Sequence, residues 1–167
     1  MISCPNCGTV FIQKPIICPN CSHIWKVPTY DIIGTFLTPT QSGLIEAGKV
    51  FPRAHVCESA VNDILMEMAT RHAQYQADHR QQGHQKFQER VEELYRTLGK
   101  YAYAEIAAES WERQKDDSMF DLGTECFKCW KHSPGHWSVA SKKHKYFGAD
   151  MRMGKDNIWY ACIITGD

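Results

Sequence analysis

Apolar residues recur at steps of three and four through the middle of the chain, which is the spacing of one face of an α-helix. The first such run is long and amphipathic and covers residues 57–78. A second run, residues 85–98, stops at Gly99, a residue type that commonly follows a helix end. Shorter patterns predict helices over residues 103–113 and 120–131.

The pattern changes near the C-terminus, where residues 146–153 and 158–165 are rich in aromatic and branched side chains. Residues 154–157 read Gly-Lys-Asp-Asn, which is a turn signal between two strands. We therefore expect an antiparallel hairpin here. Helices followed by a terminal hairpin predict an α+β fold.

A further short helix is indicated by Ser133 and Pro134, because a serine before the helix and a proline at its first position are typical of a helix start. His136 then lies in the first helical turn. The partial positive charge of that turn disfavours a protonated imidazole, so His136 is suited to bind a ligand in its neutral form. This chemistry alone still favours a histidine that is merely solvated or packed.

Two pairs of cysteines dominate residues 1–27: Cys4 with Cys7, and Cys18 with Cys21. Two CxxC pairs supply four thiolates, the ligand set of a structural zinc site, and iron is the alternative metal. So short a segment cannot bury a core of its own, so metal binding and folding should be coupled. The sequence predicts a small N-terminal zinc ribbon.

Several prolines and glycines occur in residues 28–55. This composition predicts a linker between the ribbon and a domain over residues 56–167. The chain of 167 residues is long enough for one core and one small appended module. Lys and Arg number 19, as do Asp and Glu, so the net charge is zero. The balanced charge thus argues against nucleic acid as a partner.

No apolar stretch reaches the length of a membrane helix, and the N-terminus does not read as an export signal. We therefore expect a cytoplasmic protein without a membrane span. The oligomeric state stays open. Cys126 and Cys129 are interpreted as buried small hydrophobic residues rather than metal ligands. Cys57 and Cys162 are single cysteines that could meet only in the fold, and their roles stay open.

Several short segments of the sequence resemble segments of the CAP superfamily, the cysteine-rich secretory and pathogenesis-related proteins, and they occur in the same order. Trp130–His136 resembles the Trp-x-x-Ser-Pro-Gly-His signature of its bacterial members. Ala69–Tyr75 is similar to a helix of the family, and Ala108–Trp111 occupies the place of its Gly-Glu-Asn segment. Tyr146–Ala149 and Ile158–Cys162 resemble the strands that close its sheet. The resemblance covers the chain from about residue 57 to its end.

The resemblance implies a three-layer α-β-α sandwich with a polar cleft in which histidines and acidic residues can hold a divalent ion. His136 matches the signature histidine. His79 matches the earlier one because it stands eleven residues before Arg90, and His84 is the reserve candidate.

The resemblance also implies an acidic cleft residue, for which Glu109 is the match and Glu105 the alternative. The leading hypothesis is a non-enzymatic CAP-like domain that binds a small ligand or a divalent cation through His79, Glu109 and His136. One alternative is a zinc-assisted hydrolase that uses the same three residues, since two imidazoles and a carboxylate are a minimal zinc set. The other is a zinc-ribbon adaptor for nucleic acid or protein.

Overall fold

The computed structural model describes residues 2–3, 10–11, 37–110 and 117–167. The chain divides into two compact units, Met1–Gly34 and Thr35–Asp167.

In the first unit, β1 (Ile2–Ser3) pairs with β2 (Val10–Phe11) in an antiparallel arrangement. The cysteines of the expected zinc ribbon, Cys4, Cys7, Cys18 and Cys21, lie outside the described residues. The ribbon therefore stays a prediction.

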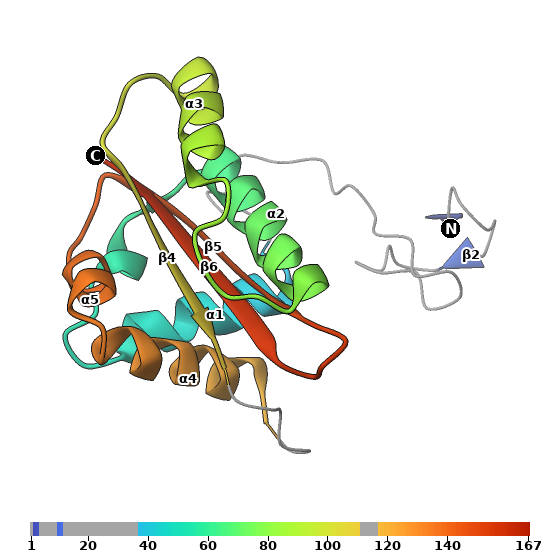
Figure 1. The fold of residues 1–167 in the computed structure, drawn as a ribbon. Helices are drawn as coiled ribbons and strands as arrows, with labels where there is room; N and C mark the ends of the chain where they lie inside the picture. Colours follow the sequence, from blue (N-terminus) through green and yellow to red (C-terminus); the bar gives the residue numbers. More distant parts are fainter. Residues whose placement is uncertain (1, 4–9, 12–36, 111–116) are drawn as a thin grey trace. The chain divides into compact units, whose positions relative to one another are not determined.

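The second unit is built on a four-stranded sheet (Figure 1). Its strands are β3 (Ala60–Val61), β5 (Tyr146–Met153), β6 (Trp159–Gly166) and β4 (Tyr103–Glu109), in that spatial order. β3 runs parallel to β5, and the other pairs are antiparallel, so the sheet is mixed. β4 is an edge strand.

The helices of this unit are interspersed with the strands, and their bounds are as follows: α1 (Pro39–Val50), the 3-10 turn η1 (Val56–Glu58), α2 (Asp63–His79), α3 (Phe87–Thr97), α4 (Met119–Lys131) and α5 (Pro134–Ala140). Together with the sheet they confirm the expected α+β class.

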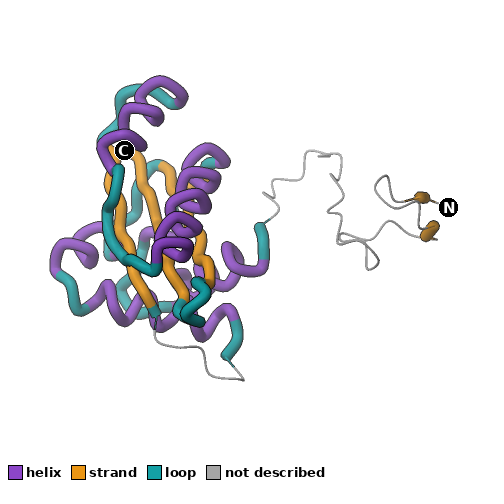
Figure 2. The backbone as a smooth tube through the Cα atoms, turned by 45° about the vertical axis from the view of Figure 1, so that its right-hand side comes forward, coloured by secondary structure: helices purple, strands orange, loops and turns teal. Residues whose placement is uncertain are grey.

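Helices cover both faces of the sheet (Figure 2). On β6, Ile163 packs into the core with residues of α1 and α4, such as Leu44 and Phe127. Its neighbours Cys162 and Ile164 point to the opposite face and pack with residues of α2 and α3. The alternation of strand side chains therefore fills two separate apolar layers.

The interpretation of residues 28–55 as a linker is wrong for its second half, because Pro39–Val50 forms α1, which packs against α4. A capping box starts this helix: the Thr38 hydroxyl accepts from the Gln41 N–H, and the Gln41 side chain accepts from the Thr38 N–H. Gly43 and Gly48, which suggested a loop, lie where a Cβ atom would collide with Met119 or with Cys57. These glycines therefore serve close packing within a helix.

The expected helix over residues 103–113 is also wrong, because Tyr103–Glu109 forms β4. The segment is rich in alanine, which favours helix in isolation. Within the fold, Ile106 and Ala108 point into the apolar layer of α1 and α4, whereas Glu105 is held by an ion pair on the strand. Tertiary packing overrides local propensity here.

The other expected elements are confirmed within a few residues at their ends. The helix expected over residues 57–78 is α2, although it begins only at Asp63. Residues 85–98 contain α3, residues 120–131 lie in α4, and the terminal hairpin is formed by β5 and β6. Ser133 precedes α5 with extended backbone, but its hydroxyl makes no capping bond. No helix in the described ranges has the length and apolar character needed to cross a membrane.

α2 approaches the sheet closely at Gly148 of β5, where a Cβ atom would collide with the backbone of Leu65 and Met66. We predict that Gly148→Ala lowers the free energy of unfolding by about 3 kcal/mol, because neither backbone can yield without moving α2. Chemical denaturation of the full chain measures this change. Gly135→Ala is the matched control, since nothing lies within 4 Å of its added Cβ; an equal effect of the two substitutions would contradict the prediction.

Candidate functional site

The site is organised around the carboxylate of Glu105 on β4, whose side chain is completely buried. Arg90 of α3 donates to it through two nitrogens, Nε to Oε2 at 2.8 Å and Nη2 to Oε1 at 2.8 Å. A third Arg90 nitrogen donates to the carbonyl of Gln85 at 2.6 Å. The two-pronged ion pair compensates the cost of burying the carboxylate and ties α3 to the edge of the sheet.

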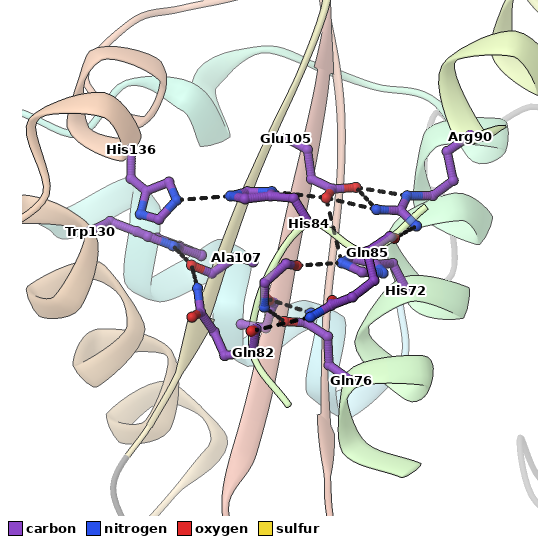
Figure 3. Close-up of polar contacts among 12 residues, drawn as sticks. His72, Gln76, Gln82, His84, Gln85, Arg90, Glu105, Ala107, Trp130 and His136 are labelled. Carbon is purple, nitrogen blue, oxygen red and sulfur yellow. Dashed lines mark hydrogen bonds and ion pairs between the residues drawn. The ribbon is translucent and has the colours of Figure 1, made fainter. Parts of the chain in front are cut away.

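Glu105 also orients His84, which lies in the loop between α2 and α3 (Figure 3). The Nδ1 atom of His84 is 3.0 Å from Oε1 of Glu105, and in the neutral ring this nitrogen donates to the carboxylate. The Nε2 atom then carries a lone pair. It faces the Nε2 atom of His136 at 3.2 Å.

His136 comes from the first turn of α5 and is half-buried. Burial lowers the pKa of His136, and the nearby positive charge that His84 can carry lowers it further. The imidazole of His136 is therefore held in its neutral form, as the start of a helix also favours.

His72 of α2 supports the site from the interior of the protein, next to Glu105. It is fully buried, its Nε2 atom donates to the carbonyl of Gly83 at 2.8 Å, and the same atom lies 3.4 Å from Glu105. Burial lowers the pKa of His72 despite the attraction of the Glu105 charge. Its Nδ1 atom has no hydrogen-bond partner among the described residues. A buried neutral imidazole thus fixes the position of the loop.

The same loop is fixed by the side chain of Gln76, which is inaccessible to solvent. Its oxygen accepts from the N–H of Gly83 at 3.1 Å, and its nitrogen donates to the carbonyl of Ala161 at 3.3 Å. Gly83 has φ of 150°, a conformation that side-chain-bearing residues rarely adopt. Polar contacts therefore position residues 80–86 over the sheet.

A cleft of about 380 Å³ opens beside this network, between β4, the loop, α4 and α5. Its walls include Gln82, Ala107, Glu109, Cys129 and His136. The cleft is large enough for a small ligand.

Only some of the expected site residues lie in the cleft. His136 and Glu109 line the cleft. His79 does not line it: its Nδ1 atom donates to the carbonyl of Tyr75 at 2.8 Å, and its ring stacks on that tyrosine with centroids 4.0 Å apart. The structure brings the reserve candidate His84, rather than His79, to His136. Glu105 takes the place beside the histidines that was expected for Glu109.

Three members of the site have no role in the sequence analysis: Gln82, His72 and Gln76. A signal for His72 existed, because it occupies a position on the apolar face of α2, where a polar residue needs a buried partner. Gln82 lies in a polar loop that offers no pattern. Within the described ranges, no three His, Cys, Asp or Glu side chains form a group that could hold a metal.

Comparison with known proteins yields a fold likeness. The sequence matches no family model and no curated protein. Among solved structures, the chain is similar to an outer surface protein from Borrelia burgdorferi, with 18% sequence identity and a TM-score of 0.54. The match covers 76% of this chain and 88% of that protein. At this identity the likeness concerns the fold alone.

The ion pair between Arg90 and Glu105 allows a direct test of the network. We predict that Arg90→Met lowers the free energy of unfolding by about 3–5 kcal/mol, because it leaves a buried carboxylate without its cation. Adding Glu105→Leu to that variant should recover part of the loss, since the buried charge is removed as well. Denaturant unfolding of both variants measures this coupling, and a double variant less stable than Arg90→Met would contradict it.

The lowered pKa values of His72 and His136 predict a pH dependence. The ordinary pKa of a histidine is about 6.5, and at a pH below this value these two histidines bind more protons in the unfolded chain than in the folded chain. The free energy of unfolding should therefore be constant with respect to these groups above about pH 6.5 and should fall as the pH is lowered toward about 5. Denaturation at a series of pH values measures the slope. The slope of the unfolding free energy against pH should be shallower in His136→Asn than in the wild type. Parallel curves for the variant and the wild type would contradict the contribution assigned to His136.

Proposed function

We propose that residues 56–167, together with α1, form a CAP-like binding domain whose cleft holds a divalent cation or a small ligand between His84 and His136. The observation that carries this proposal is the 3.2 Å separation of their Nε2 atoms, where His136 lines the cleft and His84 lies next to it. The likeness of the motif around His136 to the CAP signature supports the same assignment.

The spacing of the two imidazole nitrogens fits a zinc-like ion. With bonds of about 2.0–2.1 Å and a tetrahedral angle, two nitrogen ligands of one ion lie about 3.3 Å apart, close to the separation of the two imidazoles. Glu105 accepts from the other ring nitrogen of His84, which is the usual carboxylate support of a metal-binding histidine. Burial favours the neutral, ligand-competent form of His136.

In this proposal His84 and His136 hold the cation, Glu105 orients His84, and Arg90 neutralises Glu105. A bound cation would supply a Lewis-acidic centre able to polarise an oxygen atom of the ligand. The cleft beside the two histidines leaves room for that ligand. The cytoplasm stays the predicted location.

A zinc-assisted hydrolase is the weaker alternative. It needs Glu109, which is exposed and lines the same cleft as His136. The third residue that this hydrolase would need, His79, donates a hydrogen bond from Nδ1 to the carbonyl of Tyr75 and is not among the residues that line the cleft. A binding role needs only the facing pair of histidines, so it is better supported.

The N-terminal cysteine pairs complete the proposal. We expect Cys4, Cys7, Cys18 and Cys21 to bind one structural zinc ion, since two CxxC pairs form the usual ligand set. The full chain should therefore hold two zinc ions, one in the ribbon and one in the cleft.

Elemental analysis after equilibration with zinc and removal of free metal tests this number. We predict two zinc ions per chain in the wild type and one in the His84→Ala/His136→Ala variant, because only the ribbon ligands remain. His79→Ala is the matched control and should keep both ions, since His79 lies outside the cleft. Thermal unfolding should first establish that all three proteins are folded.

An unchanged zinc content in the double variant would reject the cleft site. A loss of zinc in His79→Ala, with retention in the double variant, would restore His79 as the ligand.

A further inference from the structure

A second hollow lies in the groove between α2 and α3, and it shares no lining residue with the cleft. Its volume is about 180 Å³. The side chains around it include three from α2 and three from α3: Met68, His72, Tyr75, Glu89, Arg90 and Glu93. At the share of about 30 Å³ that a water molecule takes in the liquid, this volume accommodates about six non-hydrogen atoms. The groove therefore fits a ligand much smaller than a drug-sized molecule.

His72 brings an unused hydrogen-bond acceptor to this groove. Its side chain is completely buried, and its Nε2 atom lies 2.8 Å from the carbonyl of Gly83 and 3.4 Å from Glu105 (Figure 3). Both of these neighbours accept hydrogen bonds, so the proton of the neutral ring lies on Nε2. Nδ1 then carries a lone pair that no donor in the described part of the chain reaches. Because an unpaired buried acceptor is costly, a ligand that donates to Nδ1 gains binding energy there.

The ligand group that meets Nδ1 has to be an uncharged donor. Burial lowers the pKa of His72 even though the charge of Glu105 raises it, so an added positive charge is disfavoured at this position. An ammonium group of a ligand would carry the same cost. An anionic group has no proton to donate. A hydroxyl group is uncharged and donates, so it fits the floor of the groove.

The rim of the groove needs both a donor and an acceptor from the ligand. The two arginines that line the groove are already paired with carboxylates. Glu89 makes no hydrogen bond or ion pair within the described residues. The ammonium group of Lys86 has the ring of Tyr75 beside it, 5.6 Å from the ring centroid. These two opposite charges favour a ligand that is neutral overall. A hydroxyl oxygen both donates and accepts, so one kind of group serves both partners.

We propose that the groove between α2 and α3 binds a small neutral polyol of the size of glycerol. One hydroxyl donates to Nδ1 of His72, a second donates to the carboxylate of Glu89, and a third accepts from the ammonium group of Lys86. Met68 offers an apolar contact to the carbon chain. Glycerol has about the number of non-hydrogen atoms that the groove accommodates. This site is separate from the proposed cation site, and neither requires the other.

The tautomer of His72 gives the first test. NMR of the ring nitrogens in the isotopically labelled full chain, at neutral pH, should show the proton on Nε2 and an unprotonated Nδ1. A proton on Nδ1 would overturn the proposal, because the ring would then offer no acceptor to the groove.

Titration with glycerol and with propane-1,3-diol, followed through the Nδ1 signal of His72, tests the occupant. The signal should move as a hydroxyl donates to Nδ1. Glycerol should bind about fivefold more tightly than the diol, which has one hydroxyl fewer and so makes one hydrogen bond fewer. Equal affinity for the two compounds would overturn the proposal. An Nδ1 signal that stays unchanged in concentrated glycerol would also overturn it, since water alone would then occupy the groove.

Two glutamates of α3 give a matched pair of variants. Glu89→Ala removes the acceptor at the rim and should weaken glycerol binding about threefold. Glu92→Ala removes the same side chain from an exposed position outside the groove, so its affinity should equal that of the wild type. Equal affinities for the two variants would overturn the proposal. Glycerol should still bind to His84→Ala/His136→Ala, so the cation site and the polyol site can fail independently.

Discussion

A single buried carboxylate connects the parts of the molecule that form the cleft. Glu105 lies on an edge strand, Arg90 reaches it from α3, and His84 reaches it from the preceding loop. Removal of a charge from water costs several kcal/mol, so Glu105 is stable in this place only while its partners surround it. The same requirement that holds α3 against the sheet therefore aims His84 at His136. Structural support and site geometry arise here from one electrostatic constraint.

The fold could be predicted where hydrophobic periodicity dominates. The apolar spacing of α2, the aromatic residues at the start of β5 and the aromatic and branched residues of β6 identify those elements. α1 was missed because Gly43 and Gly48 look like loop residues in sequence, whereas they permit close contact with Met119 and with Cys57. The role of a glycine depends on what packs against it, and that partner is distant in sequence.

The candidate site was predictable only in part, for a related reason. His136 was identified from its local context at the start of α5, and it does line the cleft. The sequence analysis favours His79 over His84 because His79 stands eleven residues before Arg90. In the structure, α2 ends at His79 and the chain then crosses the sheet, so His84 lies at the edge of β4. The resemblance matches Glu109 to the family's acidic position and leaves Glu105 as the alternative, whereas the structure places the carboxylate of Glu105 against His84.

The loop of residues 80–86 connects the histidine pair with the cleft, because it carries both His84 and the cleft-lining Gln82. Few apolar contacts hold it; its anchors are the buried side chains of Gln76 and His72, both of which bond to Gly83. If the loop opened, these side chains would lose partners that water could not easily replace within the core. The loop is therefore held closed by the cost of unsatisfied polar groups.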